Sequence, residues 1–214
     1  RGEMQRMRVW LTATALLGQA TGRTVTLGGP IELVLLPEPA MRLGDVKLGN
    51  APGAASPYLL EARRVAARLS LQSLLQGRIE VTRVALDAPR LVVEPVPGGR
   101  PNWWLPLLDG SGHGGPPLIP LSVDRIEIRQ GRLEHATGLV GQRIDAGSVD
   151  LVVRLERNGE RIRADGSAVT NGVPVTLALD LRTNASGEPP LAFSLAAPGG
   201  RLSFTGWPGQ RTAE

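Results

Sequence analysis

The chain has 214 residues, of which 42% are hydrophobic and only 3% aromatic. This length and apolar content allow one large or two small domains, and the aliphatic character suits β layers better than a core of large rings. The lack of cysteine excludes disulfides, thiolate metal ligands and a cysteine nucleophile. The formal charge is +4, and acidic and basic residues alternate instead of clustering, so we expect no nucleic-acid partner.

The first 22 residues predict a helix. Apolar residues from Arg6 to Ala20 recur at helical spacings, and Gly18 with Gly22 supplies a stop. The apolar stretch is far shorter than the roughly 20 residues that a membrane-spanning helix needs. We therefore expect any membrane anchor to precede Arg1.

Residues 23–108 predict a first β region. Two alternating strands flank the turn at Gly28-Gly29-Pro30, and a third strand follows. In that third strand the apolar phase slips between Leu43 and Val46, so we expect a bulge that restores the face.

The rest of this region is more mixed. The composition favours a short helical turn over Tyr58–Ala62, a strand to Leu71, and a one-turn helix over Ser73–Gln76 that Gly77 caps. One or two strands follow, with Pro89 as an edge or a break.

A flexible linker and a second β region complete the chain. Residues 109–117 are rich in glycine and proline and mark the best candidate boundary. Beyond them, residues 118–214 alternate strictly between turns at Asn158-Gly159, Asn171-Gly172 and Gly199-Gly200, which predicts a meander of antiparallel strands. The predicted fold class is therefore mainly β and antiparallel, with an N-terminal helix and short helical turns.

Residues suited to catalysis or metal binding are few. His113 lies in the linker and His135 in a strand, without the spacing of a zinc site, so we expect no metal and no cofactor. Gly110, Gly112 and Gly115 match GxGxxG, but the prolines that follow forbid the helix that this motif needs. We expect no enzymatic activity; a hydrolase would require His135 to converge with a carboxylate and a hydroxyl.

Several segments, in order, resemble the N-terminal region of the AsmA family. They are "ATGRTVTLGG", "LLP", "MRLGDVKLGNAPG", "ARRVAARLSLQSLLQGRIEVTRVALDAPRLVVE" and "GGRPNWW", and "IEIRQGRLEH" with the later strands is similar to the family's continuing repeats. The resemblance implies a protein of the Gram-negative envelope, anchored in the inner membrane and facing the periplasm. Relatives include TamB-like proteins and, more distantly, the eukaryotic bridge-like lipid transfer proteins.

The paired tryptophans Trp103 and Trp104 allow two interpretations. Adjacent exposed rings could form a platform for a ligand. In the family an Asn-Trp after a glycine commonly closes the first run of strands, so the resemblance favours a cap at the sheet end.

The resemblance implies a role in phospholipid transport to, and assembly or homeostasis of, the outer membrane. An open, curved sheet with one apolar face would form a groove for acyl chains while headgroups stay in water. We expect the groove to be lined by two alternating sets: Val149, Leu151, Val153 and Leu155, then Val173, Val175, Leu177, Leu179 and Leu181. The alternatives are a closed sandwich, whose faces would bury each other, and a non-transporting scaffold that binds partner proteins in outer-membrane protein assembly.

Overall fold

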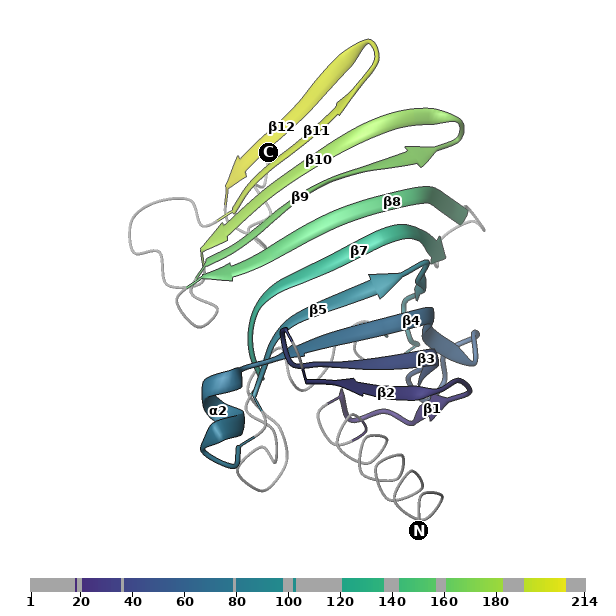
Figure 1. The fold of residues 1–214 in the computed structure, drawn as a ribbon. Helices are drawn as coiled ribbons and strands as arrows, with labels where there is room; N and C mark the ends of the chain where they lie inside the picture. The colour runs from purple at the N-terminus through teal and green to yellow at the C-terminus, as the bar shows by residue number, and fades with distance from the viewer. Residues whose placement is uncertain are drawn as a thin grey trace.

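The described residues build one large β-sheet. The computed structural model describes residues 18, 21–35, 37–78, 80–97, 102, 121–136, 143–156, 161–182 and 191–206. All strands within these ranges join a single sheet of 12 strands, stacked from β1 at one end to β12 at the other (Figure 1). The predicted mainly β class is therefore confirmed.

The strands follow one another across the sheet nearly in chain order. They are β1 (Val25–Leu27), β2 (Ile31–Val34), β3 (Ala40–Gly49), β4 (Tyr58–Leu69), β5 (Val81–Asp87), β6 (Arg90–Val93), β7 (Leu121–Ala136), β8 (Arg143–Glu156), β9 (Arg161–Thr170), β10 (Val173–Arg182), β11 (Leu191–Ala197) and β12 (Gly200–Gly206). The short helix α2 (Leu71–Leu75) lies beyond the ends of β4 and β5 (Figure 1).

The two predicted regions share this sheet through parallel pairing. Strands β5 and β6 both pair with β7 in parallel, whereas the other ladders are antiparallel. The sequence predicted antiparallel strands throughout. The difference arises because a parallel pair needs a long crossover, and the chain between β6 and β7 supplies one.

Residues 58–77 correct one prediction and confirm another. Tyr58–Ala62, expected as a helical turn, is the first part of β4, because its main chain pairs with β3 and β6. The predicted one-turn helix exists as α2, two residues earlier than expected. Gly77 follows it with φ of 72°, as a capping glycine requires.

The expected restoration of the apolar face in β3 occurs without an extra residue. Asp45 has a left-handed φ of 47°, and Leu43 and Val46 on either side of it belong to one buried cluster. The pairing of β3 with β4 keeps one register through this point. The positive φ of Asp45 therefore restores the apolar face, a role that the sequence predicted for a β-bulge.

Similar left-handed residues form a line across the sheet. Ala88, Gln130 and Ser148 have φ values of 48°, 52° and 48°, and they interrupt β5–β6, β7 and β8. The register sets Ala88 level with Gln130, and Gln130 N donates to Asp150 Oδ1 in β8 at 3.0 Å. We call the line through Asp45, Ala88, Gln130 and Ser148 the bend line.

Several predicted features lie wholly or mostly outside the described residues. They are the helix within 1–22, the linker 109–117, the Asn158-Gly159 turn and the tryptophans at 103 and 104. Within the described part of the chain, no helix has the length and apolar character to cross a membrane. The Asn171-Gly172 turn is confirmed, with φ values of 50° and 77° between β9 and β10.

Candidate functional site

Two uninterrupted apolar rows cross one face of the sheet from β2 to β12. Residues paired across neighbouring strands point to the same side, so the register defines each row. The first row is Ile31, Leu43, Val65, Leu86, Ile128, Leu151, Gly166, Leu177, Leu195 and Leu202. The second row is Leu33, Met41, Ala67, Val84, Ile126, Val153, Ala164, Leu179, Phe193 and Phe204. We call this side the apolar face and the other side the polar face.

Burial decreases along the first row. Leu43 is 2% exposed and Leu86 is 9% exposed, whereas Leu202 in β12 is 63% exposed. Between them, Leu151 and Leu177 are half-buried. Since every described strand belongs to one sheet, no second sheet of described residues closes over this face. Among the described residues, the far half of the apolar face is therefore not covered by a second layer of strands, and its exposure is greatest in β12.

The candidate residues from β8 and β10 share the apolar face. Leu151 and Leu177 both pair with Gly166, and Val153 and Leu179 both pair with Ala164. Leu155 and Leu181 lie level with each other across β9, and Val149, Val173 and Val175 follow the same alternation. None of these nine side chains is buried, and Val173 is 42% exposed.

Residues outside the two predicted sets complete the apolar face. Ile162, Ala164 and Gly166 of β9 separate the two predicted sets, and the rows continue into the first β region through Ile126 and Ile128. Alternation was visible in each strand. Only the register between strands shows that these residues form continuous rows.

Apolar side chains crowd one another on the apolar face beside the bend line and at Gly166. A Cβ added to Gly131 would lie 2.8 Å from Ile128 Cγ2 and 3.3 Å from Pro89 Cγ, so apolar side chains converge there. A Cβ on Gly166 would lie 2.8 Å from Leu151 Cδ1. The missing side chains of these two glycines therefore leave room for their apolar neighbours.

The polar face carries a network of ion pairs. Arginines stand opposite one another on neighbouring strands, a pairing that destabilises a sheet unless acids intervene. The ladder is Arg68, Arg83, Arg125, Arg154 and Arg163. Arg125 Nε donates to Glu127 at 2.7 Å, Arg154 Nη1 to Asp165 at 2.9 Å, and Arg163 Nη1 lies 3.3 Å from Glu156.

Two carboxylates in this network have lowered pKa values. The hydrogen bond from Arg129 lowers the pKa of Glu127, with a further contribution from Arg125. The hydrogen bonds from Arg161, at 2.9 and 2.5 Å, lower the pKa of Asp180. Both carboxylates are therefore held in the charged form, and the polar face stays hydrated.

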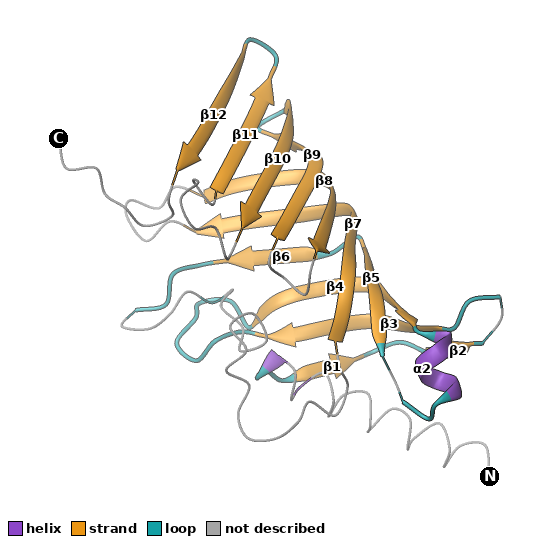
Figure 2. Cartoon of the chain, turned by 90° about the vertical axis from the view of Figure 1, so that its left-hand side faces the viewer, coloured by secondary structure: helices purple, strands orange, loops and turns teal. Residues whose placement is uncertain are grey.

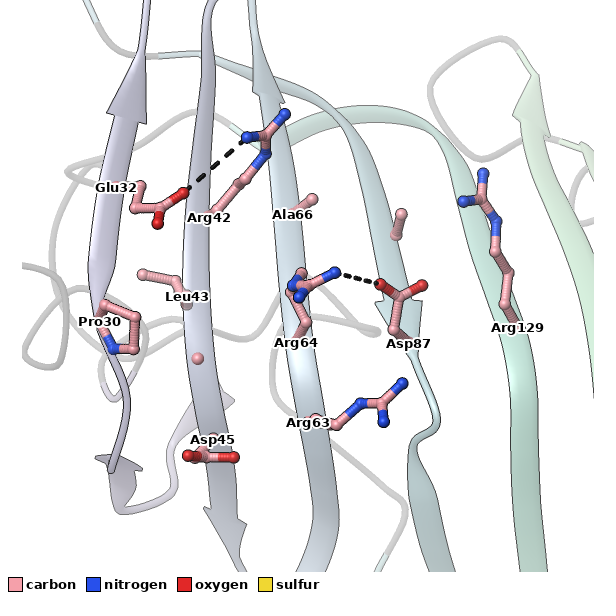
Figure 3. A pocket seen from close by; sticks show the side chains of 12 residues that line it. Pro30, Glu32, Arg42, Leu43, Asp45, Arg63, Arg64, Ala66, Asp87 and Arg129 are labelled. Carbon is pink, nitrogen blue, oxygen red and sulfur yellow. Dashed lines mark ion pairs between the residues drawn. The ribbon is translucent and has the colours of Figure 1, made fainter.

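A depression lies on the polar face beside Asp45 of the bend line. Figure 3 shows Arg63 and Arg64, consecutive in β4, both turned into this depression, where Arg64 Nη1 lies 3.6 Å from Asp87. Arg42 faces Glu32 at 3.9 Å across the same depression. Arginines and carboxylates alternate here, so most of the charge is compensated within the depression itself.

One end of the polar face is covered by a buried polar network. Asn102 is fully buried; its Nδ2 donates to Val92 O at 2.7 Å, and its Oδ1 accepts from Glu94 N at 2.9 Å. The buried Glu94 carboxylate accepts from Asn50 Nδ2 at 2.7 Å and from Ser56 N at 3.0 Å. Asn102, which precedes the two tryptophans, thus closes β6 at its end. The predicted capping role of the tryptophans themselves lies outside the described residues.

His135 lies at the far end of β7. Its Nδ1 is 3.2 Å from Val93 O, and its strand partner is Ile144. Over the described residues, no group of histidine and acidic side chains is arranged to hold a metal ion. His113 lies outside the described ranges.

Comparison with known proteins bears on the first β region. Residues 13–108 match the AsmA family, which confirms the resemblance found in the sequence. Neither the curated proteins nor the solved structures gave a match. The matched segment contains every strand from β1 to β6 together with α2.

Proposed function

From the match of residues 13–108 to the AsmA family, we propose that the apolar face carries phospholipid acyl chains in the bacterial envelope. The proposed setting is the periplasmic side of the inner membrane, and the proposed process is phospholipid transport to, and homeostasis of, the outer membrane. The observation that carries this proposal is the pair of uninterrupted apolar rows from β2 to β12, which no second sheet of described residues covers.

The physical basis is the transfer of acyl chains out of water. Each buried CH₂ group contributes about 0.8 kcal/mol, so an exposed acyl chain cannot cross an aqueous space freely. A face of leucine, valine and isoleucine offers an apolar surface along the whole stack of strands. No covalent step is involved, in keeping with the proposal that the protein is not an enzyme.

The polar face supports the same proposal through its charge. Its arginines and carboxylates compensate one another in ion pairs that remain partly exposed. Such a surface stays in water, so a lipid would meet the sheet from the apolar side alone. Headgroups would then project from the margins of that side into solvent.

A scaffold function is the alternative, and the edge strand β12 favours it. None of its residues is buried, and Leu202 and Phe204 are 63% and 49% exposed. An exposed strand edge can accept a strand from a partner protein in envelope assembly. In that case the apolar face would pack against protein and would not hold lipid.

Leu177→Asp tests the proposal. Leu177 is half-buried in the middle of the first row, so a carboxylate there stays partly hydrated and the melting temperature falls only modestly. We expect the variant to lose most of the phospholipid that co-purifies with, or photocrosslinks to, the parent chain. Mass spectrometry of extracted lipid and a thermal melt provide both measurements.

Thr176→Asp is the matched control. Thr176 is exposed on the polar face of the same strand, next to Ser167 and Ala196. We expect this variant to retain lipid at the parent level. The scaffold function would be favoured if the parent and Leu177→Asp captured equal amounts of lipid, or if the parent never captured lipid.

A further inference from the structure

The helix α2 exposes two of its three leucines, half-buries Leu74 and buries its serine. Ser73 is 4% exposed, whereas Leu71 and Leu75 are 52% and 81% exposed. These two leucines are four residues apart and therefore share one side of the helix. A helix that packs on a sheet normally buries its apolar side, so this arrangement is inverted.

Polar contacts attach α2 to the sheet in place of its leucines. Ser70 caps the helix by accepting from Ser73 N at 3.2 Å, and Ser73 Oγ donates to the Glu80 carboxylate. Arg78 N donates to Ser73 O at 2.8 Å. The helix is thus held by its serines, and its exposed leucines are free for another contact.

Two further exposed leucines lie at the same end of the sheet. Leu33 and Leu35 are 60% and 58% exposed, at the end of β2. The backbone bond from Leu69 N to Pro39 O, 2.9 Å long, joins the segment after β2 to the last residue of β4, two residues before α2. We call Leu33, Leu35, Leu71 and Leu75 the leucine tip. Figure 2 shows α2 beside β2 at this end.

We infer that the leucine tip inserts into the surface of a lipid bilayer, where acyl chains pass onto the apolar face. The second half of this inference rests on the proposed function. Leu33 belongs to the second apolar row and pairs with Met41, so a chain that leaves the bilayer at the tip meets the row directly. Because the tip continues directly into the proposed lipid-binding row, we take a bilayer, and not a protein, as the partner of the tip.

Charge and shape favour the same occupant. Three arginines lie at this end: Arg68, which pairs with Glu38, its strand partner Arg83, and Arg78, whose backbone N donates to Ser73 O. Of the acids nearby, Glu38 is thus paired with Arg68 and the Glu80 carboxylate is bonded to Ser73. Arginines next to inserted apolar side chains bind the phosphates of anionic lipids. The leucines stand on a projecting helix and strand end, a shape that suits insertion between headgroups.

Partition into vesicles tests the tip. The 214-residue chain is mixed with vesicles of phosphatidylcholine and phosphatidylglycerol, and bound protein is measured by flotation. We expect the Leu71→Gln/Leu75→Gln double variant to partition at least about tenfold more weakly than the parent. Glutamine keeps helix propensity close to that of leucine, and both sites are exposed, so the melting temperature should stay within about 2 °C.

Val169→Gln is the matched control, since Val169 is an exposed apolar residue of β9 that lies outside both apolar rows and far from the tip. We expect its partition to stay within about twofold of the parent value. An equal loss in Val169→Gln would mean general adsorption of apolar surface and would overturn the inference. Unchanged partition of the double variant would overturn it as well.

A single label locates the insertion. The chain has no cysteine, so Leu75→Cys introduces a unique thiol for an environment-sensitive fluorophore. We expect a blue shift on vesicles, with none for Ser203→Cys on the polar face of β12. A label that stays in water, or a parent whose exposed leucines instead form a dimer by sedimentation without vesicles, would overturn the inference.

Failure of the tip and failure of the proposed function give different results. Leu177→Asp removes acyl capture but leaves the tip intact, so it should bind vesicles like the parent. The Leu71→Gln/Leu75→Gln variant should still capture short-chain phospholipid supplied as monomers. Loss of only one activity in the corresponding variant therefore assigns the failure to one site.

Discussion

Gly166 lies where the two halves of the predicted lipid-binding set meet. It pairs with Leu151 on one side and with Leu177 on the other, in the first apolar row. A Cβ at this position would lie 2.4 Å from Asp150 O and 2.8 Å from Leu151 Cδ1. The missing side chain therefore leaves room for Leu151 and for the backbone of β8 beside β9.

Gly166→Ala should destabilise the sheet. Because the clash involves backbone as well as a side chain, we expect a loss of about 1–3 kcal/mol in the free energy of unfolding. Gly147→Ala in β8 is the control, since a Cβ there meets nothing within 4 Å. Urea denaturation of both variants measures the difference, and equal stability would show that β8 shifts to make room.

Single residues also mark the limit of sequence-based prediction. The phase slip between Leu43 and Val46 correctly predicted a local irregularity, but not that Asp45 alone would absorb it with positive φ. A left-handed conformation is predicted readily at glycine, but not at residue types such as those of Ala88, Gln130 and Ser148. Their alignment on one bend line depends on pairing between distant strands, which alternation within one strand does not contain.

At the scale of elements, the composition of a segment gave the wrong secondary structure where pairing between strands determines it. Tyr58–Ala62 contains good helix formers, yet it forms a strand because β3 and β6 offer main-chain partners on both sides. Eight residues after β4 ends, Gly77 ends a true helical turn with the predicted cap. Local sequence signals thus predicted turns and helix caps correctly, because these depend on neighbouring residues. They failed to predict the strand over Tyr58–Ala62, because strand pairing there overrides helix propensity.

The ion pairs of the polar face predict an acid-dependent loss of stability. The lowered pKa of Asp180, caused first by its hydrogen bond from Arg161, means that the folded state favours the charged carboxylate. Its contribution is present above the unfolded pKa of about 4 and is lost as pH falls through the lower folded pKa. Stability should therefore decline below about pH 4.

Asp180→Asn should flatten this decline. Thermal melts between about pH 2 and pH 6 measure the slope in parent and variant. Arg161→Gln removes the first cause of the shift and should flatten the slope to a similar degree, with little further change in the double variant. An unchanged slope in both single variants would place the acid sensitivity in other carboxylates.

At the scale of the whole molecule, the sequence indicated the type of surface but not its extent. Alternation in β8 and β10 identified one apolar side, and the register then joined it to Leu86 and Leu43, more than 60 residues earlier in the chain. That junction depends on the parallel pairing of β5 and β6 with β7, which no local pattern encodes. A long crossover brings the matched first region and the second β region into one surface.

A continuous surface makes a prediction that separate lipid sites do not. If acyl chains reach the face at the leucine tip and move along the rows, a block at Leu177 should affect the two ends differently. A photocrosslinking amino acid is placed at Met41 in β3 or at Leu195 in β11, on either side of β10. Crosslinking to phospholipid is then measured with and without Leu177→Asp, after incubation with vesicles.

We expect the block to preserve crosslinking at Met41 and to reduce it several-fold at Leu195. The reason is that a hydrated carboxylate in the first row imposes a desolvation cost on any acyl chain that passes it. Equal yields at both positions, with or without the block, would mean that lipid reaches β11 directly from solvent or through the exposed edge at β12. A loss at both positions would instead mean that the face binds lipid as one unit and that chains do not move along it strand by strand.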